Sequence, residues 1–180
     1  MHGVRVKVLG GTVAGLLLSM GIPGCHTKSS ATPENFIKGL NAHFLDHPEC
    51  LFPEAPMFPY ETSNPAKKKQ MDALAASQLL TASQGVVSRY VTTPAGLKLA
   101  PRFCYGHREA TAIDSFTPPT PRNGFPETDV VYRYKVDEVP VWAQSQIVKQ
   151  AFPKLGQQTA GESTDKATLA GTMAGWQVPE

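Results

Sequence analysis

The sequence predicts an α+β fold in which a mainly helical N-terminal part, residues 32–101, is followed by a β-β-α-β-β part, residues 102–180. Apolar residues recur at helical spacing between positions 36 and 45 and again between 71 and 80. Residues 128–136 instead alternate between apolar and polar side chains, which is typical of a strand. The 16 prolines and 15 glycines of the chain predict many turns and some long loops.

The first 25 residues have the pattern of an export signal. Two basic residues precede an apolar run of 13 residues, Val8–Met20. This run is too short to span a bilayer, because a spanning helix needs roughly 20 residues. The segment Ile22-Pro23-Gly24-Cys25 resembles the lipobox of bacterial lipoproteins. The resemblance implies that residues 1–24 are a signal peptide, that Cys25 is lipidated, and that the protein is anchored in the cell envelope and faces the periplasm.

Cleavage before Cys25 would leave a chain without net charge. The formal charge of +2 falls to zero, because the signal holds two basic residues and no acidic one. A neutral chain gives no electrostatic support for nucleic-acid binding, which normally shows as a basic excess. Residues 25–31 combine the lipidated cysteine with a short polar tether, and His26 favours sorting to the outer membrane.

Helix-start signals open the N-terminal part. Thr32-Pro33-Glu34 combines a capping residue, a proline and an acid, and predicts a helix that ends before Pro48. Residues 50–64 hold several prolines and predict an ordered loop over the core. Asn64-Pro65 repeats the capping signal and predicts a second helix that continues through Leu80.

Residues 65–100 resemble the recognition helix and wing of bacterial winged-helix repressors. A predicted helix ending in Leu79-Leu80 is followed by a turn, a predicted strand at 86–92, and the segment Thr93-Pro94-Ala95-Gly96. The resemblance implies a winged-helix-like shape for the N-terminal part. DNA binding follows only as a second alternative function, and only if the export signal is misread, because an exported protein meets no chromosome.

The C-terminal part is predicted to be mainly β. Residues 103–116 predict a long strand, residues 117–127 a loop, and residues 128–136 the clearest strand of the chain. Pro140 opens a predicted helix that ends at Pro153. A small hairpin formed by residues 166–172 and 176–178 completes the predicted fold.

Three chemical arrangements are open for the remaining cysteines: a disulfide, a zinc site and free thiols. Cys50 and Cys104 form an even pair, and in an oxidising compartment such a pair predicts a disulfide. Alternatively the cysteines and nearby histidines hold zinc, because two histidines four apart on a helix share a face and a Cys-x2-His pair completes a tetrahedral site. The residues of that alternative zinc site are His43, His47, Cys50, Cys104 and His107.

No catalytic signature is present in the sequence. Nucleophile-elbow, zinc-protease, phosphate-loop and dinucleotide motifs are all missing. Tyr132, Tyr134 and Trp142 are candidates for lining a ligand pocket between a strand and a helix. The sequence therefore predicts a non-enzymatic binding or envelope-assembly module without a cofactor, which recruits an envelope protein or peptide. A zinc- or thiol-dependent envelope enzyme is the first alternative.

Overall fold

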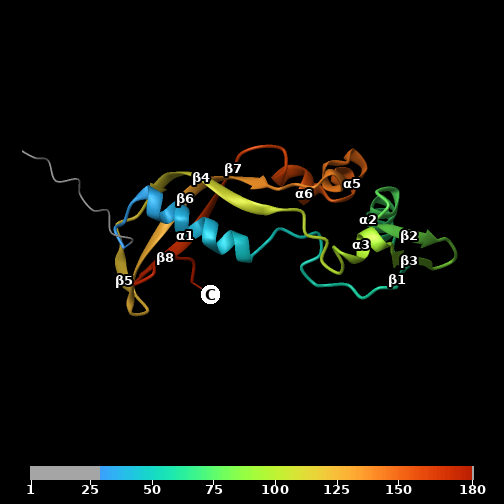
Figure 1. Cartoon of the computed structure of the whole chain (residues 1–180), viewed down its shortest axis with the longest axis horizontal. Coiled ribbons are helices and arrows are strands. Elements are labelled where there is room, and N and C mark those ends of the chain that lie inside the picture. Colours follow the sequence, from blue (N-terminus) through green and yellow to red (C-terminus); the bar gives the residue numbers. More distant parts are fainter. Residues whose placement is uncertain (1–28, 180) are drawn as a thin grey trace, which may run out of the picture.

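The computed structural model describes residues 29–179 and shows an elongated molecule with one antiparallel sheet near each end (Figure 1). The predicted signal peptide, Cys25 and most of the tether lie outside the described residues. Within residues 29–179, none of the helices has the length and apolar character that crossing a bilayer requires.

The larger sheet is five-stranded and curled, and its longest strand lies at its centre. The pairing order is β4-β6-β7-β8, and β5 also pairs with β6. Every pairing in this sheet is antiparallel, and the register between β4 and β6 shifts twice, after Ala110 and after Ile113 in β4. Its strands are β4 (His107–Phe116), β5 (Thr120–Arg122), β6 (Phe125–Asp137), β7 (Ser163–Thr172) and β8 (Gly175–Gln177).

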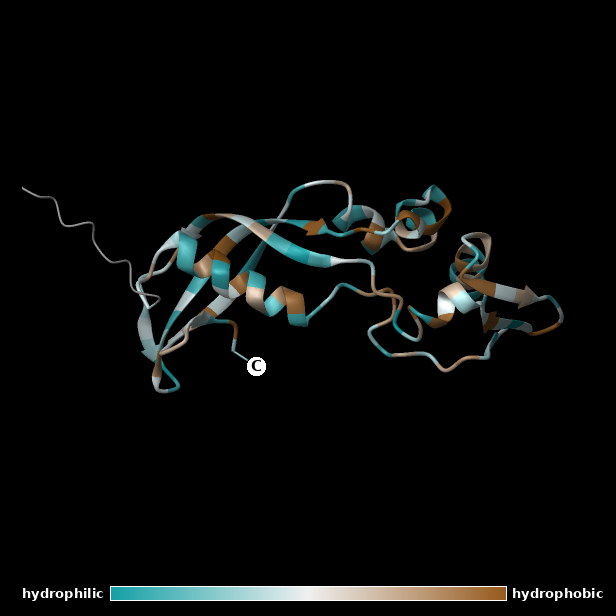
Figure 2. Ribbon diagram, in the orientation of Figure 1, coloured by the Kyte–Doolittle hydropathy of each residue, from teal (hydrophilic) through white to brown (hydrophobic). Residues whose placement is uncertain are grey.

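Helix α1 (Pro33–Asp46) fills the inside of this curled sheet. Thr32 caps the helix by accepting a hydrogen bond from the backbone N–H of Asn35, and the helix ends before Pro48, as predicted. Its buried residues Phe36, Leu40 and Phe44 recur every four positions and so share one side of the helix, and Figure 2 shows hydrophobic and hydrophilic segments along it. The buried cluster between α1 and the sheet consists of Phe36, Leu40, Phe44, Ala110, Val130, Tyr132, Tyr134, Leu169 and Trp176.

The same helix covers both edges of the curled sheet. On the β4 edge, the Asn41 side chain accepts from the Ala110 N–H at 2.7 Å and donates to the Ala110 carbonyl at 3.4 Å. Its amide thus pairs with β4 as the backbone of a neighbouring strand would. On the β8 edge, Gly39 lies so close to Trp176 that a Cβ at this position would stand 2.2 Å from the Trp176 carbonyl oxygen. Only glycine lets the helix approach this strand.

The second sheet lies at the opposite end of the molecule (Figure 1). Its order is β1-β3-β2, formed by β1 (Tyr60–Thr62), β2 (Leu80–Ser83) and β3 (Ser88–Thr92). The helices at this end are α2 (Pro65–Ala76), α3 (Pro94–Leu97), α4 (Val141–Gln144), α5 (Gln146–Ala151) and α6 (Pro153–Gln158). Its buried cluster combines residues 52–105 with residues 143–155, so both halves of the sequence contribute to this core.

The predicted fold class is wrong. Residues 32–101 do not form a helical, winged-helix-like part, because they contain the three-stranded sheet and because α1 packs on the other sheet. The predicted second helix stops at Ala76, since Gln78 adopts a positive φ of 61° and Leu80 already begins β2. Apolar residues such as Leu79 and Leu80 fit either a short strand or a helix end, so periodicity did not distinguish the two.

The predicted β-β-α-β-β order of residues 102–180 is also too simple. Within the predicted loop, Asn123-Gly124 joins β5 to β6, and both residues have positive φ values of 51° and 84°. The predicted single helix after Pro140 is broken by Ser145, whose ψ of 132° is extended, and three short helices replace it.

Candidate functional site

The predicted disulfide between Cys50 and Cys104 is confirmed. The two sulfur atoms are 2.00 Å apart, and the bond joins the segment after α1 to the segment before β4. Backbone hydrogen bonds flank it, from the Glu49 N–H to the Gly106 carbonyl and from the Tyr105 N–H to the Glu49 carbonyl, each 2.8 Å long. The bond lies between the two cores and covalently links these two segments at the middle of the molecule.

The histidines of the alternative zinc site do not gather around these cysteines. His43 and His47 stack at the end of α1 with ring centroids 4.0 Å apart, and His47 Nδ1 lies 2.8 Å from the His43 carbonyl oxygen. His107 instead lies 3.6 Å from a carboxylate oxygen of Glu138. Among residues 29–179, no cluster of three or more His, Cys, Asp or Glu could hold a metal ion. A disulfide sulfur also offers no thiolate to zinc.

The three aromatic residues predicted to line a pocket lie in different places. Tyr132 and Tyr134 are buried against α1, with ring centroids 5.9 Å apart. Trp142, on α4, packs against the core at the other end of the molecule. Its indole Nε1 is buried and makes no hydrogen bond in the described structure. Both tyrosines belong to the core around α1, and Tyr132 also lines a cavity that is described below.

Arg108, on β4, is the centre of a polar network at the middle of the molecule. Its guanidinium contacts Glu49 at 2.6 Å and Asp165 at 2.7 Å, and it donates to the Tyr132 hydroxyl at 3.4 Å. The same guanidinium lies 4.6 Å from the centroid of the Tyr134 ring, within the range of a cation–π contact. Strand β4, strand β7 and the segment after α1 are thus joined through one side chain.

The network keeps the carboxyl group of Glu49 ionised. Burial alone would raise the pKa of Glu49, but hydrogen bonds from Gln158 and Arg108 and the positive charge of Arg108 together lower this pKa below its usual value. Burial opposes the charge on Arg108 as well, yet Glu49 and Asp165 raise its pKa. Burial first, and the Glu49 charge second, raise the pKa of Tyr105, which donates to Gln158 at 2.5 Å. These groups stay in fixed protonation states near neutral pH, which suits a structural network.

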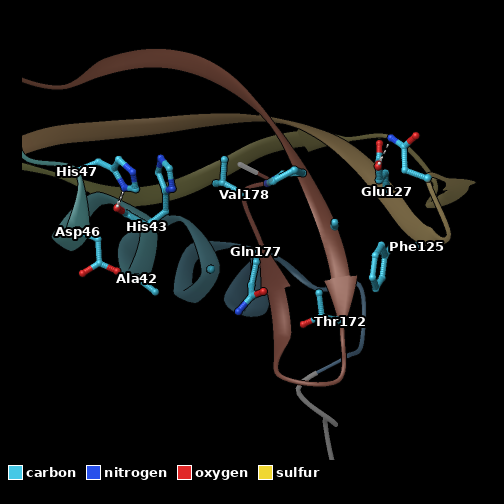
Figure 3. A pocket seen from close by; sticks show the side chains of 13 residues that line it. Ala42, His43, Asp46, His47, Phe125, Glu127, Thr172, Gln177 and Val178 are labelled. Carbon is cyan, nitrogen blue, oxygen red and sulfur yellow. Dashed lines mark hydrogen bonds between the residues drawn. The ribbon is translucent and has the colours of Figure 1, made fainter. Parts of the chain in front are cut away.

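A groove with a volume of about 630 Å³ lies between α1 and the β5–β6 hairpin, and we call it the α1 groove (Figure 3). Its size is typical of ligand sites. The histidine pair stands at one end, Phe125 and Glu127 stand at the other, and β7 and β8 form the floor between them (Figure 3). The lining residues are Gly39, Ala42, His43, Asp46, His47, Asn123, Phe125, Glu127, Ala170, Thr172, Gln177, Val178 and Pro179.

Both carboxyl side chains of the α1 groove stand without a lysine or arginine beside them in its described lining. They belong to Asp46 and Glu127. Glu127 is largely buried and accepts a hydrogen bond from the Asn123 side chain at 3.2 Å. Phe125, by contrast, exposes about half of its surface (49%) at the rim. An acidic groove with an aromatic face is suited to a cationic side chain that also has an apolar stem.

A second cavity of about 410 Å³ adjoins the α1 groove. It is bounded by Arg108, Tyr132 and Asp165, so the polar network forms one of its walls. His43, Val178 and Pro179 line both hollows. The C-terminal segment therefore separates the two, and together they form a longer depression beside α1.

Sequence reasoning missed most of these residues. Residues 117–127 were predicted to be irregular, although Asn123-Gly124 is a strong signal for a two-residue hairpin turn, which places Phe125 and Glu127 on a strand. No local signal marked Arg108, because its partners are 57 and 59 positions away. Only His43 and His47 of the predicted site residues line the α1 groove.

Comparison with known proteins identifies no family: no family model, curated protein or solved structure matches this chain.

Proposed function

We propose that this chain is a lipoprotein of the bacterial cell envelope, anchored through Cys25 in the outer membrane and facing the periplasm. Its body is a binding module that recruits an envelope protein or peptide and catalyses no reaction. The support for export is the apolar run followed by Ile22-Pro23-Gly24-Cys25. The support for binding is the α1 groove.

The acidic lining of the α1 groove carries the proposal on binding. Two carboxylates without a lysine or arginine among the described lining residues attract a positive group. The lining runs from the histidine pair to Phe125 and Glu127, and this elongated shape suits an extended segment better than a small compact ligand (Figure 3). The proposed ligand is therefore a peptide segment that presents arginine or lysine next to apolar residues.

Lipidation is tested by metabolic labelling with a fatty-acid analogue. The wild-type protein is expected to incorporate the label, and Cys25→Ser is expected to lose it and to remain as an unprocessed precursor. Label retained by Cys25→Ser would contradict the anchor.

Binding is tested with two synthetic peptides that share the same apolar residues and differ only in carrying lysine and arginine or glutamate. The basic peptide is expected to bind, and added salt is expected to weaken the complex. The double variant Asp46→Asn, Glu127→Gln should bind about tenfold more weakly, corresponding to ~1.4 kcal/mol.

A matched control removes two acids elsewhere. Glu54→Gln with Glu61→Gln changes the net charge by the same amount, but neither residue lines the α1 groove. Circular dichroism first establishes that both double variants fold. Equal loss of binding in the two double variants, or equal binding of the two peptides, would exclude the α1 groove as a basic-peptide site. Crosslinking in an envelope extract, followed by mass spectrometry, then identifies the natural segment.

A further inference from the structure

Large apolar side chains are exposed at one end of the five-stranded sheet. Phe125 begins β6 and exposes 49% of its surface, and Met173 in the β7–β8 turn is fully exposed. Phe116, at the end of β4, exposes 41%. Antiparallel pairing places Phe125 and Met173 at one level of the sheet, because Glu127 pairs with Ala170. We call Phe116, Phe125 and Met173 the apolar end.

The described chain also begins at this end. The Trp176 indole donates to the Ser30 carbonyl at 3.0 Å, and Trp176 follows the turn that holds Met173 by three positions. Figure 1 shows the start of α1, β5 and the β7–β8 turn at one end of the molecule and the β2–β3 hairpin at the other.

The anchor leaves little distance between this end and the membrane. Ser29 follows Cys25 by four positions, and an extended chain spans at most about 3.5 Å per residue, or ~14 Å in total. A lipid on Cys25 would hold that residue at the bilayer surface. The side of the body nearest to the bilayer is then the apolar end.

We propose that the apolar end docks on the lipid surface, with Phe125 and Met173 entering the interface between headgroups and acyl chains. The proposal rests on lipidation of Cys25. Exposed aromatic and apolar side chains beside the anchor add to membrane binding, because binding strength scales with the apolar area buried at the interface. We expect docking through apolar insertion, because the nearby Arg122 is already paired with Asp129 at 3.5 Å.

Docking determines the orientation of the molecule relative to the bilayer. The β2–β3 hairpin, with Val86 almost completely exposed (99%), is expected to point away from the bilayer. The α1 groove opens beside the membrane, because Phe125 belongs to both its rim and the apolar end. The peptide partner is then received close to the lipid surface.

The test uses full-length lipidated protein in vesicles of zwitterionic phosphatidylcholine. Met173→Cys and Val86→Cys are each labelled with an environment-sensitive fluorophore, and brominated lipids serve as a quencher. We expect a blue-shifted, quenched fluorophore at position 173 and a water-like, unquenched one at position 86. Both positions are solvent-exposed turns of the described structure, so the pair is matched.

A second measurement follows the distance between position 86 of the folded body and the bilayer surface. Energy transfer from the fluorophore at position 86 to an acceptor lipid should be low in the wild-type background. Transfer should increase when Phe125→Ser and Met173→Ser are combined, because the body is then free to tilt about its tether. A fluorophore at position 173 that stays in water while the fatty acid is present on Cys25 would overturn docking and leave the lipoprotein proposal intact. Absence of the fatty acid would overturn both.

Discussion

At the scale of single residues, Arg108 contributes more to the stability of the fold than any pattern in the sequence suggested. The side chains of Arg108 and Glu49 are 19% and 13% exposed, so their contact is shielded from water. A shielded ion pair stabilises a fold only when its groups find further partners, because burial of each charge is costly. Here Asp165, Tyr132 and Lys154 supply those partners. Because Lys154 lies on α6, whose Leu155 belongs to the other core, the arrangement also connects the two cores.

Glu49 makes the stability of the protein depend on pH. Its pKa is lower in the folded than in the unfolded state, so its contribution is fully present above the unfolded value of about 4.5 and is lost as pH falls through the folded value. Glu49→Gln should therefore lower the free energy of unfolding at pH 7 by about 1–3 kcal/mol, as loss of a hydrogen bond to a charged group does. Denaturant titrations between pH 3 and 7 measure this difference.

The difference between Glu49→Gln and the wild type should shrink as the pH falls below 4.5. Glu61→Gln is the control, since Glu61 forms an exposed ion pair with Arg89 and such pairs contribute at most about 1 kcal/mol. A difference for Glu49→Gln that stays constant over the whole pH range would show that its ionisation is not linked to folding.

At the scale of elements, the sequence predicted those that carry their own start and stop signals. Helix α1 has a capping threonine, a proline at its first turn and a terminating proline, and it begins and ends where expected. Strand β6 alternates clearly and is present, although it is longer than predicted. The disulfide was predicted from the even pair of cysteines together with the oxidising compartment that the export signal indicates.

Elements that depend on distant partners were not predictable. Strand β1 has three residues and exists only because β3 pairs with it. The α1 groove requires α1 to lie beside strands that follow it by more than 70 positions, and no local pattern in the sequence indicates that these elements are neighbours. The winged-helix-like prediction failed for the same reason: a helix and a hairpin in succession do not determine what packs on them.

The contact of α1 with the β4 edge gives a prediction for Asn41. Asn41→Ala leaves the N–H and carbonyl of the buried Ala110 without their partner, which should cost about 1–3 kcal/mol. The better helix propensity of alanine offsets less than 1 kcal/mol of this. Lys38→Ala, at an exposed position on the same helix, is the control and should change stability little. Denaturant titration measures the free energy of unfolding of both variants. An Asn41→Ala protein that is as stable as Lys38→Ala would mean that the contact with the β4 edge contributes nothing.

At the scale of the whole molecule, two cores are interleaved along one chain. Helix α1 packs with the second half of the sequence, and helices α4–α6 pack with the first half. Neither half of the sequence contains a complete core, so the division at residue 101 that the sequence suggested does not separate two packed units.

The disulfide should account for a large share of the total stability. It closes a loop across 54 positions, and the chain-entropy model gives a stabilisation of about 4 kcal/mol for a loop of this length. The double variant Cys50→Ser, Cys104→Ser should lose about this amount in denaturant titrations. The intact mass of the wild type should be about 2 Da below that of its reduced form, because the bond replaces two S–H hydrogens. Two freely alkylated thiols in the untreated protein would contradict the bond.

The packing of α1 between β4 and β8 also determines when folding can be completed. The Trp176 indole and the Ser30 carbonyl are 146 positions apart, so this contact joins the first described residues to nearly the last. Contacts of such high contact order form late and slowly, because the entropy of closing a long loop is lost before the contact stabilises anything. The larger core therefore cannot be completed on a nascent or partly translocated chain, and it assembles only after the final strand has arrived.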